Sequence, residues 1–385
     1  MIAKRAGAPR VWHVGGDDVH LRIPLLLRLR AAGFDVAAAG AGCARLFEAA
    51  GIPYFEYGLA PGLSPLADLR ARGRLARLLR EQRPDIVHAF DTKPGLLVPH
   101  AARAAGGVVC TRTIVGLGRL FARDDLAARV GRAVYRGAQK HVAPGCALTV
   151  FQNEDDRREF VKHGLLKGRP HALVRGSGVD ADALRAAAPG AERVAALRRE
   201  LGAGVGEGAL VLMVARVVAS KGVREFMAAA AELRAERAAR FVLVGPADGE
   251  RAASALRREL EASPDVSWLG RRDDVPALLA AADVFALPTY YREGLPRVLL
   301  EAAAMRVPIV TTPVPGCREV VQDGVTGLVV PPRDARALAA ALRRLLDDAA
   351  LRNRLTAAAD ERVRSQFSLE RVAAEYAALY RQLLN

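Results

Sequence analysis

Two short segments in the second half of the chain combine charged side chains with glycine turns in a pattern that suits anion binding. In the first segment, Arg216 and Lys221 follow an apolar run and precede a helical pattern. We expect both cations to lie near a helix N-terminus, where backbone N–H groups already favour an anion. A guanidinium can bind two phosphate oxygens at once, and an ammonium adds a point charge. The segment therefore predicts a phosphate site, or else a pair of solvated cations at a strand end.

The second segment begins at Glu293-Gly294, which we expect to form a turn, with Pro296 in the first turn of a helix. Glu301 lies seven positions after Gly294, so it faces roughly the same way about 10 Å further along a helix. A ligand lying along this face would meet Glu293 at one end, helix N–H groups in the middle and Glu301 further along. The sugar, diphosphate and ribose of a nucleotide sugar follow one another in that order over a similar length. The alternative is two ordinary surface glutamates, but Glu301 lies in the apolar stretch 298–305, where a charge needs a polar partner.

Short apolar strands alternating with helical patterns predict the elements that position these segments. We expect strands at 10–14, 34–39, 85–90, 107–113, 148–152, 209–215, 241–245, 266–269, 283–288, 308–311 and 327–330. We expect helices at 21–32, 66–82, 223–236, 250–262, 275–281, 295–306, 335–347, 349–364 and 369–384. This alternation indicates an α/β fold of two doubly wound, Rossmann-like parallel-sheet domains. Ligands of such sheets bind beyond the carboxyl ends of the strands.

We expect a hinge between the two series at Gly176-Ser177-Gly178-Val179-Asp180. We therefore expect an N-terminal domain at 1–178, a C-terminal domain at 179–365, and a final helix at 366–385 that packs back toward the N-terminal domain.

Composition limits the function classes. With 51% hydrophobic residues the chain is not disordered, and with 5% aromatics it is poorly suited to stack nucleic-acid bases. No run approaches the roughly 20 apolar residues of a membrane-spanning helix. The N-terminal apolar run is too short and too glycine-rich for a signal peptide, so we expect a cytoplasmic protein. The cysteines lie far apart and form no C-x-x-C pair, and no metal-ligand pattern is present.

The net charge of +15 is uneven along the chain, because residues 1–180 hold 28 basic and 16 acidic side chains. Such a basic half favours an anionic partner: nucleic acid, an anionic membrane surface or a phosphorylated substrate. The helix expected at 66–80 has leucines on one side and five arginines. It could lie on anionic lipid, or it could pack its leucines on the sheet. The two interpretations are compatible, because arginines outside the core stripe remain free for lipid.

The two segments of the second half together resemble retaining glycosyltransferase family 4, which has the GT-B fold of two Rossmann-like domains facing a central cleft. The resemblance rests on Arg216 with Lys221, on the Glu-x7-Glu pattern from Glu293 to Glu301, and on residues 308–310, 316–319 and 323–327.

The first half matches less strongly, through His13, Gly15, His20-x-Arg22-x-Pro24, Thr92-Lys93-Pro94-Gly95 and 116–118. It looks like a bacterial subgroup that adds amino sugars to lipid-diphosphate-linked glycans during capsule, O-antigen or glycoprotein assembly. Val115 stands where many members of the family have a histidine.

The resemblance implies a nucleotide-sugar donor, UDP-linked and carrying an N-acetylated amino sugar, held mainly by the C-terminal domain. The catalytic candidates are Arg216 and Lys221, which would neutralise the leaving diphosphate, and Glu293, which would bind hydroxyls of the transferred sugar. Further donor-binding candidates are Glu301 at the ribose, Gly294 and Leu295 at phosphate, Arg271 or Arg272 near the base, and Gly15 and Gly16.

The N-terminal domain would hold a lipid-linked saccharide acceptor, with His13, His20 and Lys93 as candidates. A lone histidine after a strand is also often structural. No metal or cofactor is implied, because Arg216 and Lys221 supply the charge. The enzyme would work in the cytoplasm, at the inner face of the membrane.

Two other functions remain open from the residues. A nucleotide-sugar 2-epimerase has a similar two-domain architecture and would need no acceptor. A basic nucleic-acid-binding protein is the third reading; against it stand the low aromatic content, the absence of a recognition motif, and the location of the motifs in the near-neutral half.

Overall fold

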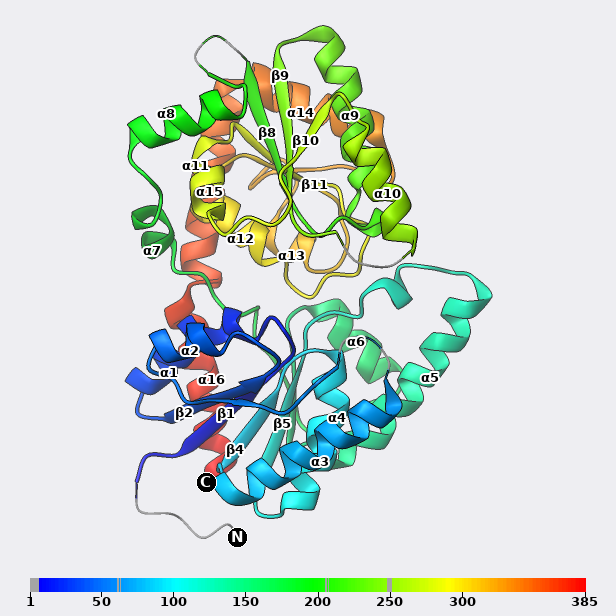
Figure 1. Cartoon of the computed structure of the whole chain (residues 1–385), viewed down its shortest axis with the longest axis vertical. Coiled ribbons are helices and arrows are strands. Elements are labelled where there is room, and N and C mark those ends of the chain that lie inside the picture. The colour runs from blue at the N-terminus through cyan, green and yellow to red at the C-terminus, as the bar shows by residue number, and fades with distance from the viewer. Residues whose placement is uncertain (1–6, 61, 63, 205, 207, 248–250) are drawn as a thin grey trace. The chain divides into compact units, whose positions relative to one another are not determined.

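The computed structural model describes residues 7–60, 62, 64–204, 206, 208–247 and 251–385. The chain forms two compact units (Figure 1). Unit 1 comprises Met1–Gly178 together with Leu369–Asn385, and unit 2 comprises Val179–Ser368. Over these described residues, each unit is built on one parallel sheet, of seven strands in unit 1 and six in unit 2. The predicted class of two doubly wound parallel-sheet domains is therefore confirmed.

The sheet of unit 1 has the strand order β3-β2-β1-β4-β5-β6-β7. Its strands are β1 Arg10–Val14, β2 Asp35–Gly40, β3 Tyr54–Glu56, β4 Ile86–Ala89, β5 Val109–Ile114, β6 Leu148–Phe151 and β7 His171–Leu173. The edge strands β3 and β7 were not predicted. Neither contains a buried residue, so neither has the run of buried apolar residues that marks the central strands. The order reverses between β1 and β4, which makes this the ligand edge expected of a doubly wound sheet.

Helices cover both faces of this sheet. They are η1 Val19–Arg22, α1 Ile23–Ala31, α2 Ala44–Ala49, α3 Pro65–Gln82, α4 Thr92–Ala105, η2 Arg119–Phe121, α5 Leu126–Val142, η3 Ala143–Gly145, α6 Glu154–Lys162 and α16 Leu369–Leu384. Alternating residues of β1 face opposite ways: Val11 packs with α1 and α16, and Trp12 packs with α3 and α4. The C-terminal α16 thus completes the core of unit 1, where it packs against α1.

Helix α3 is the arginine-rich helix expected at 66–80. Ala71, Leu75 and Leu79 are fully buried in the cluster that includes Trp12 and Val14. Their spacing of four places them on one side of the helix. Leu75 and Leu79 therefore pack on the sheet, as predicted, whereas Leu66 and Leu69 near the start of the helix are 73% and 53% exposed.

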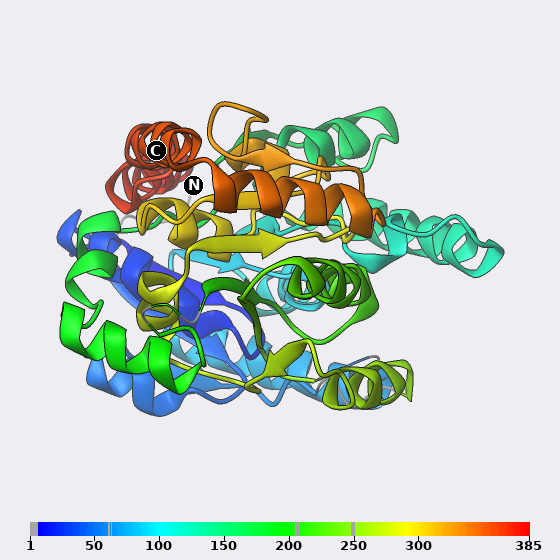
Figure 2. The same ribbon diagram turned by 90° about the horizontal axis from the view of Figure 1, so that it is seen from above.

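The sheet of unit 2 has the order β10-β9-β8-β11-β12-β13 and reverses between β8 and β11. All six strands were expected: β8 Ala209–Val214, β9 Ala239–Val244, β10 Val266–Trp268, β11 Val284–Leu287, β12 Ile309–Thr311 and β13 Leu328–Val329. The helices are α7 Ala181–Ala186, α8 Ala191–Glu200, η4 Ala219–Lys221, α9 Val223–Glu236, α10 Arg251–Glu261, α11 Val275–Ala281, α12 Arg297–Ala304, α13 Cys317–Val320, α14 Ala335–Asp347 and α15 Ala349–Gln366. Figure 2 shows α14 (orange) and α9 (green) beside these strands.

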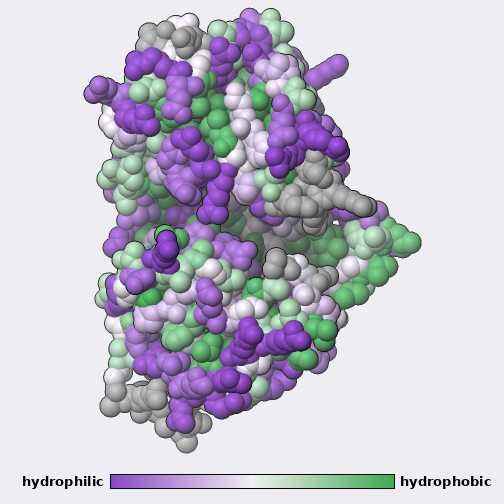
Figure 3. Space-filling model, viewed as in Figure 1, coloured by the Kyte–Doolittle hydropathy of each residue, from purple (hydrophilic) through white to green (hydrophobic). Residues whose placement is uncertain are grey.

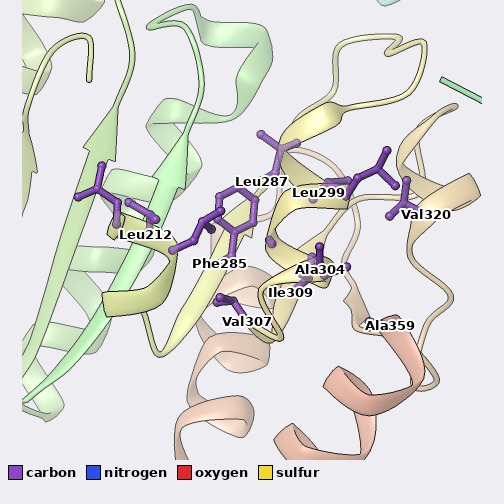
Figure 4. Packing of buried hydrophobic residues seen from close by; sticks show 14 of the residues in the cluster. Leu212, Phe285, Leu287, Leu299, Ala304, Val307, Ile309, Val320 and Ala359 are labelled. Atoms are coloured by element: carbon purple, nitrogen blue, oxygen red, sulfur yellow. The ribbon is translucent and has the colours of Figure 1, made fainter. Parts of the chain in front are cut away.

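A buried apolar cluster fixes α12 on the sheet of unit 2 (Figure 4). Leu299 of α12 packs in one cluster with Phe285 and Leu287 of β11, and all three are at most 1% exposed. The helix begins at Arg297 with Pro296 as its N-cap. The prediction of a helix from residue 295 was therefore wrong at this end, and Gly294 and Leu295 lie in the preceding turn.

Among the described helices, none combines the length and the apolar character that a bilayer crossing requires.

Candidate functional site

The two predicted segments of unit 2 meet at the carboxyl ends of β8 and β11. Gly222 has φ +81°, and a Cβ there would lie 2.1 Å from the Pro288 carbonyl oxygen, so a side chain could not be accommodated. Tyr290 N donates a hydrogen bond to Ser220 O at 2.9 Å. The loop after β8 is thus held directly against the loop after β11, at the point where the strand order reverses.

The centre of this contact is an ion pair between Lys221 and Glu293. Lys221 Nζ lies 2.5 Å from Glu293 Oε1, and the two side chains are 15% and 10% exposed. The Thr289 hydroxyl donates to the same carboxylate oxygen at 3.2 Å. The ammonium also lies 4.9 Å from the centre of the Tyr291 ring, within cation–π distance. The pair is therefore largely withdrawn from water and held from several sides.

Arg216 lies in the same loop as Lys221, two residues beyond the end of β8. Its side chain is exposed, whereas its neighbour Val217 is buried. Gly245 allows the ends of β8 and β9 to approach, since a Cβ there would lie 2.0 Å from Ala215 O. This close packing fixes the backbone at Arg216. Because its side chain is exposed, a ligand at this edge of the sheet can reach the guanidinium.

A third loop, after β12, completes the surroundings of Glu293. Gly316 has φ +83°, and a Cβ there would lie 2.4 Å from Gly294 O and 2.9 Å from Glu293 O. Gly294 is itself buried, and Leu295 is half-buried. The Cys317 thiol lies in this region, and burial raises its pKa, with the nearby Glu293 carboxylate adding to the effect. The thiol is therefore a protonated, unreactive part of the packing.

Glu301 lies on α12 with its side chain 16% exposed. Arg297 Nε donates to Glu301 Oε1 at 2.7 Å, from one helical turn earlier. The polar partner that the apolar stretch 298–305 required is thus Arg297.

Arg271 and Arg272 follow β10 and have different surroundings. Arg272 forms two hydrogen bonds with the Asp274 carboxylate, at 2.8 and 2.6 Å, and thereby holds the pKa of that carboxyl below its usual range. Asp274 is the N-cap residue of α11, although its side chain makes no capping hydrogen bond, so Arg272 holds the carboxylate directly before that helix. Arg271 is exposed, and its Nε lies 3.6 Å from Oδ1 of Asp273, which is more exposed still. Of the two candidates, Arg271 is the more exposed, with its side chain 72% exposed against 28% for Arg272.

In unit 1, His13 was predicted to face an acceptor, but it lies in the core. Its side chain is 0% exposed, on the central strand β1, and Nε2 lies 3.0 Å from the Tyr380 hydroxyl. Burial, with Arg22 nearby, lowers the pKa of His13 to about 3. The same tyrosine hydroxyl lies 2.8 Å from His88 Nδ1. His13 is therefore a neutral core residue; Tyr380, its partner, lies 367 positions away, which sequence spacing could not reveal.

Lys93 also differs from its predicted role on the acceptor side. Its ammonium lies 2.5 Å from Asp68 Oδ1 and donates to the carbonyls of Ala60 at 2.5 Å and Gly62 at 2.8 Å. It therefore anchors the loop before α3 to the start of α4. His20 remains partly accessible, with Nδ1 3.1 Å from Asp17 O and 3.4 Å from Cys43 Sγ.

The loop after β1 lies beside a residue that sequence reasoning missed, Asp91. Gly15 cannot take a side chain without displacing Val19, since its Cβ would lie 3.0 Å from Val19 Cβ. Gly16 N donates to Asp91 Oδ2 at 3.4 Å. Asp91 has φ +73°, an uncommon conformation outside glycine, and burial together with Asp18 raises its pKa to about 7. An acidic residue directly after the strand expected at 85–90 was the available signal.

Residues 208–348 match the family described as "Glycosyl transferases group 1", and residues 24–176 match the "Glycosyl transferase 4-like domain". The chain belongs to the family 4 glycosyltransferases. It is 32% identical over 339 residues to N-acetyl-alpha-D-glucosaminyl L-malate synthase of Bacillus anthracis, covering 83% of this chain and 80% of that one.

Two further curated relatives of this glycosyltransferase are bacterial. An N,N'-diacetylbacillosaminyl-diphospho-undecaprenol alpha-1,3-N-acetylgalactosaminyltransferase of Campylobacter jejuni is 28% identical, covering 86% of this chain and 85% of that one. The alpha-D-kanosaminyltransferase of Streptomyces kanamyceticus is 31% identical over 66% of this chain, a match that spans 65% of that relative.

Solved structures confirm the GT-B fold of this glycosyltransferase. Anabaena Alr3699/HepE, in complex with UDP and glucose, superposes with a TM-score of 0.80 at 19% identity, covering 97% of this chain and 100% of that one. Sucrose-phosphate synthase of Thermosynechococcus elongatus gives a TM-score of 0.79 at 20% identity, covering 98% and 99%.

Proposed function

We propose that this glycosyltransferase moves an N-acetylated amino sugar from a UDP-sugar to a lipid-diphosphate-linked saccharide, with retention of anomeric configuration. The observation that carries the proposal is the Lys221–Glu293 pair, held at the ligand edge of unit 2 with Arg216 in the same loop. Two cations and a fixed carboxylate, at the adjacent carboxyl ends of two strands, suit a ligand that joins a diphosphate to a hydroxyl-rich sugar.

The names of relatives support the substrate classes. The Campylobacter relative is named for an acceptor on undecaprenol diphosphate and for transfer of N-acetylgalactosamine. An Escherichia coli relative, 25% identical over 77% of this chain, is named a UDP-Gal:alpha-D-GlcNAc-diphosphoundecaprenol alpha-1,3-galactosyltransferase. The kanosaminyltransferase likewise transfers an amino sugar, by its name. Capsule, O-antigen or related glycan assembly would employ such an activity.

We assign the donor site from the contacts described above. Lys221 and Arg216 stabilise the charge that develops on the leaving diphosphate, an electrostatic role that needs no metal ion. Glu293, already oriented by Lys221 and Thr289, accepts hydrogen bonds from hydroxyls of the transferred sugar. Glu301 accepts from the ribose hydroxyls, the Gly294 and Leu295 N–H groups bind phosphate, and Arg271 lies near the base.

Retention follows from a same-face mechanism in this proposal. The carbon–oxygen bond to the diphosphate breaks as the acceptor oxygen approaches from the same side, and the departing phosphate oxygen takes the acceptor proton. Glu293 is committed to Lys221 and to sugar hydroxyls, so it serves binding and not nucleophilic attack.

Unit 1 would supply the acceptor side at its own ligand edge, between β1 and β4. Gly16, His20 and the Asp91 carboxyl lie at this edge, whereas His13 and Lys93 are committed to internal contacts. We place the reaction in the cytoplasm, where UDP-sugars are available, with the lipid-linked acceptor presented at the inner face of the membrane.

Incubation with labelled UDP-N-acetylhexosamines, with and without a polyprenyl-diphosphate-linked amino sugar, tests the proposal. We expect a lipid-linked product that requires the acceptor, forms in the presence of a chelator, and has the anomeric configuration of the donor by NMR. Release of a 2-epimer of the donor without acceptor would instead support an epimerase and contradict the proposal.

A further inference from the structure

Helix α5 presents an apolar stripe to solvent. Leu126, Val130 and Val134 are 75%, 58% and 68% exposed. They are spaced by four residues, so they fall within about 80° of the helix circumference. Ala128 and Gln139 on the opposite side are buried. The helix therefore packs on unit 1 by one side and turns an apolar side outward.

The stripe is more than ordinary surface scatter. The described residues include nine exposed large hydrophobic side chains, and three of them lie on this one line. Figure 1 shows α5 at the edge of unit 1, and Figure 3 shows apolar residues (green) gathered at that edge. Single exposed apolar residues need no explanation, but an aligned group of them marks an interaction surface.

Basic side chains border the stripe. Arg129 and Lys140 are exposed and lie on the same flank of the helix, roughly 40–60° from Leu126. No described carboxylate forms an ion pair with either of them. The acidic residues at the start of the helix, Asp124 and Asp125, are paired with arginines. An approaching surface therefore meets apolar side chains beside uncompensated positive charge.

We propose that α5 docks on an anionic lipid surface. Leu126, Val130 and Val134 insert at the boundary between headgroups and acyl chains, and Arg129 and Lys140 contact the lipid phosphates. A second copy of this chain fits less well, because a symmetric pairing of the stripes would bring the same cations together. The inference rests on the proposed function only in that a lipid-linked acceptor makes a membrane a fitting partner.

Co-sedimentation with phosphatidylcholine vesicles, with and without phosphatidylglycerol, tests the stripe. The full chain should bind the anionic vesicles, and the variant L126Q/V130Q/V134Q should bind them roughly tenfold or more weakly. The matched controls Leu46→Gln and Val161→Gln change exposed apolar residues on other helices of unit 1 and should bind like the wild type. Binding by the triple variant at the wild-type level, or no binding by the wild type at low salt, would overturn the proposal.

Two further variants separate insertion from adsorption. In Val130→Trp, the tryptophan emission should shift to shorter wavelength when anionic vesicles are added, because the indole enters an apolar layer. The variant R129Q/K140Q should weaken binding to anionic vesicles and flatten its dependence on salt. An unshifted emission in the bound state would contradict insertion. If the wild type self-associated, and L126Q/V130Q/V134Q lost this self-association but still bound vesicles, the stripe would be a contact with a second copy of this chain. That result would contradict the proposal.

Vesicle binding is measured without donor or acceptor, so it does not depend on the proposed reaction. With a short-chain, water-soluble acceptor, the triple variant should turn over at the wild-type rate, whereas transfer to an acceptor embedded in vesicles should slow. Equal slowing with both acceptors would contradict a docking role for α5. Failure of the wild type with both acceptors, while it still binds vesicles, would count against the proposed reaction and leave the docking surface supported.

Discussion

Lys221 Nζ lies 2.5 Å from Glu293 Oε1 and joins the loop after β8 to the loop after β11. Lys221→Met should lower turnover by about 10²–10³-fold, because it removes one of the cations that stabilise the leaving diphosphate. It should also lower the free energy of unfolding by about 1–3 kcal/mol, since Glu293 then loses a partner while largely buried. Steady-state kinetics and urea denaturation measure the two effects.

A double-mutant cycle isolates this contact. The variant K221M/E293Q should be less destabilised than the two single variants added together, because each single change leaves a charge without its partner. The control pair Arg224→Met and Glu259→Gln breaks an exposed ion pair of the same unit and should leave stability and turnover nearly unchanged. Full additivity of the Lys221 and Glu293 substitutions would show that the contact contributes nothing.

Glu301 should act on donor affinity more than on turnover. Loss of a hydrogen bond between a ligand and a charged group costs about 1.5–3 kcal/mol, so Glu301→Gln should raise the KM for the donor by roughly 10–100-fold while kcat changes little. Arg297→Gln removes the helix partner of Glu301 without removing the carboxylate, and should raise KM much less. A large fall in kcat for Glu301→Gln, with unchanged KM, would contradict the ribose assignment.

Substitution of Arg271 should affect UDP binding, whereas substitution of Arg272 should affect the stability of the protein. Arg271→Gln should weaken binding of UDP, measured by calorimetry, and leave Tm unchanged, because its side chain is exposed. Arg272→Gln should lower Tm modestly, because it breaks the two hydrogen bonds to the N-cap of α11. If Arg272→Gln weakened UDP binding and Arg271→Gln did not, the base would lie beside Arg272, which would contradict the assignment to Arg271.

The sequence was most informative about unit 2, and the reason is physical. Most of its strands are short, continuous apolar runs with few exposed residues, separated by helices of ordinary length, so runs of strand length alternate with helical patterns along the sequence. Unit 1 was less predictable. The edge strands β3 and β7 contain no buried residue and so lack a run of buried apolar side chains. Helix α5, with three large apolar residues facing solvent, does not show the pattern of a core helix.

Some residues of the site could be predicted from their local sequence, and others depend on contacts with residues far away in the chain. Arg216, Lys221 and Glu293 could be chosen from their places after predicted strands, because the carboxyl ends of parallel strands meet at one edge. The burial of His13 depends on Tyr380 of α16, and the commitment of Lys93 depends on Asp68 of α3. Contacts between residues so far apart in the chain leave no spacing pattern to recognise.

Asp91 should make the stability of the protein depend on pH in a defined direction. Its pKa is about 7 in the folded protein, above the ordinary 3.8, chiefly because it is buried. Between these values the folded state binds more protons than the unfolded state. The contribution of Asp91 is therefore fully present below about pH 4 and is lost as the pH rises toward 7, by at most about 1.4 kcal/mol per pH unit.

Asp91→Asn carries no titrating proton, so its free energy of unfolding should rise relative to the wild type as the pH increases from about 4 to 7. Urea denaturation of both proteins across this range measures the difference. His13, whose pKa is lowered to about 3 by burial, acts in the opposite direction in the wild type and in the variant alike, so it cancels in the comparison. A difference between the two proteins that stays constant over the range would show that the Asp91 carboxyl titrates normally and is not held in a water-poor site beside Gly16.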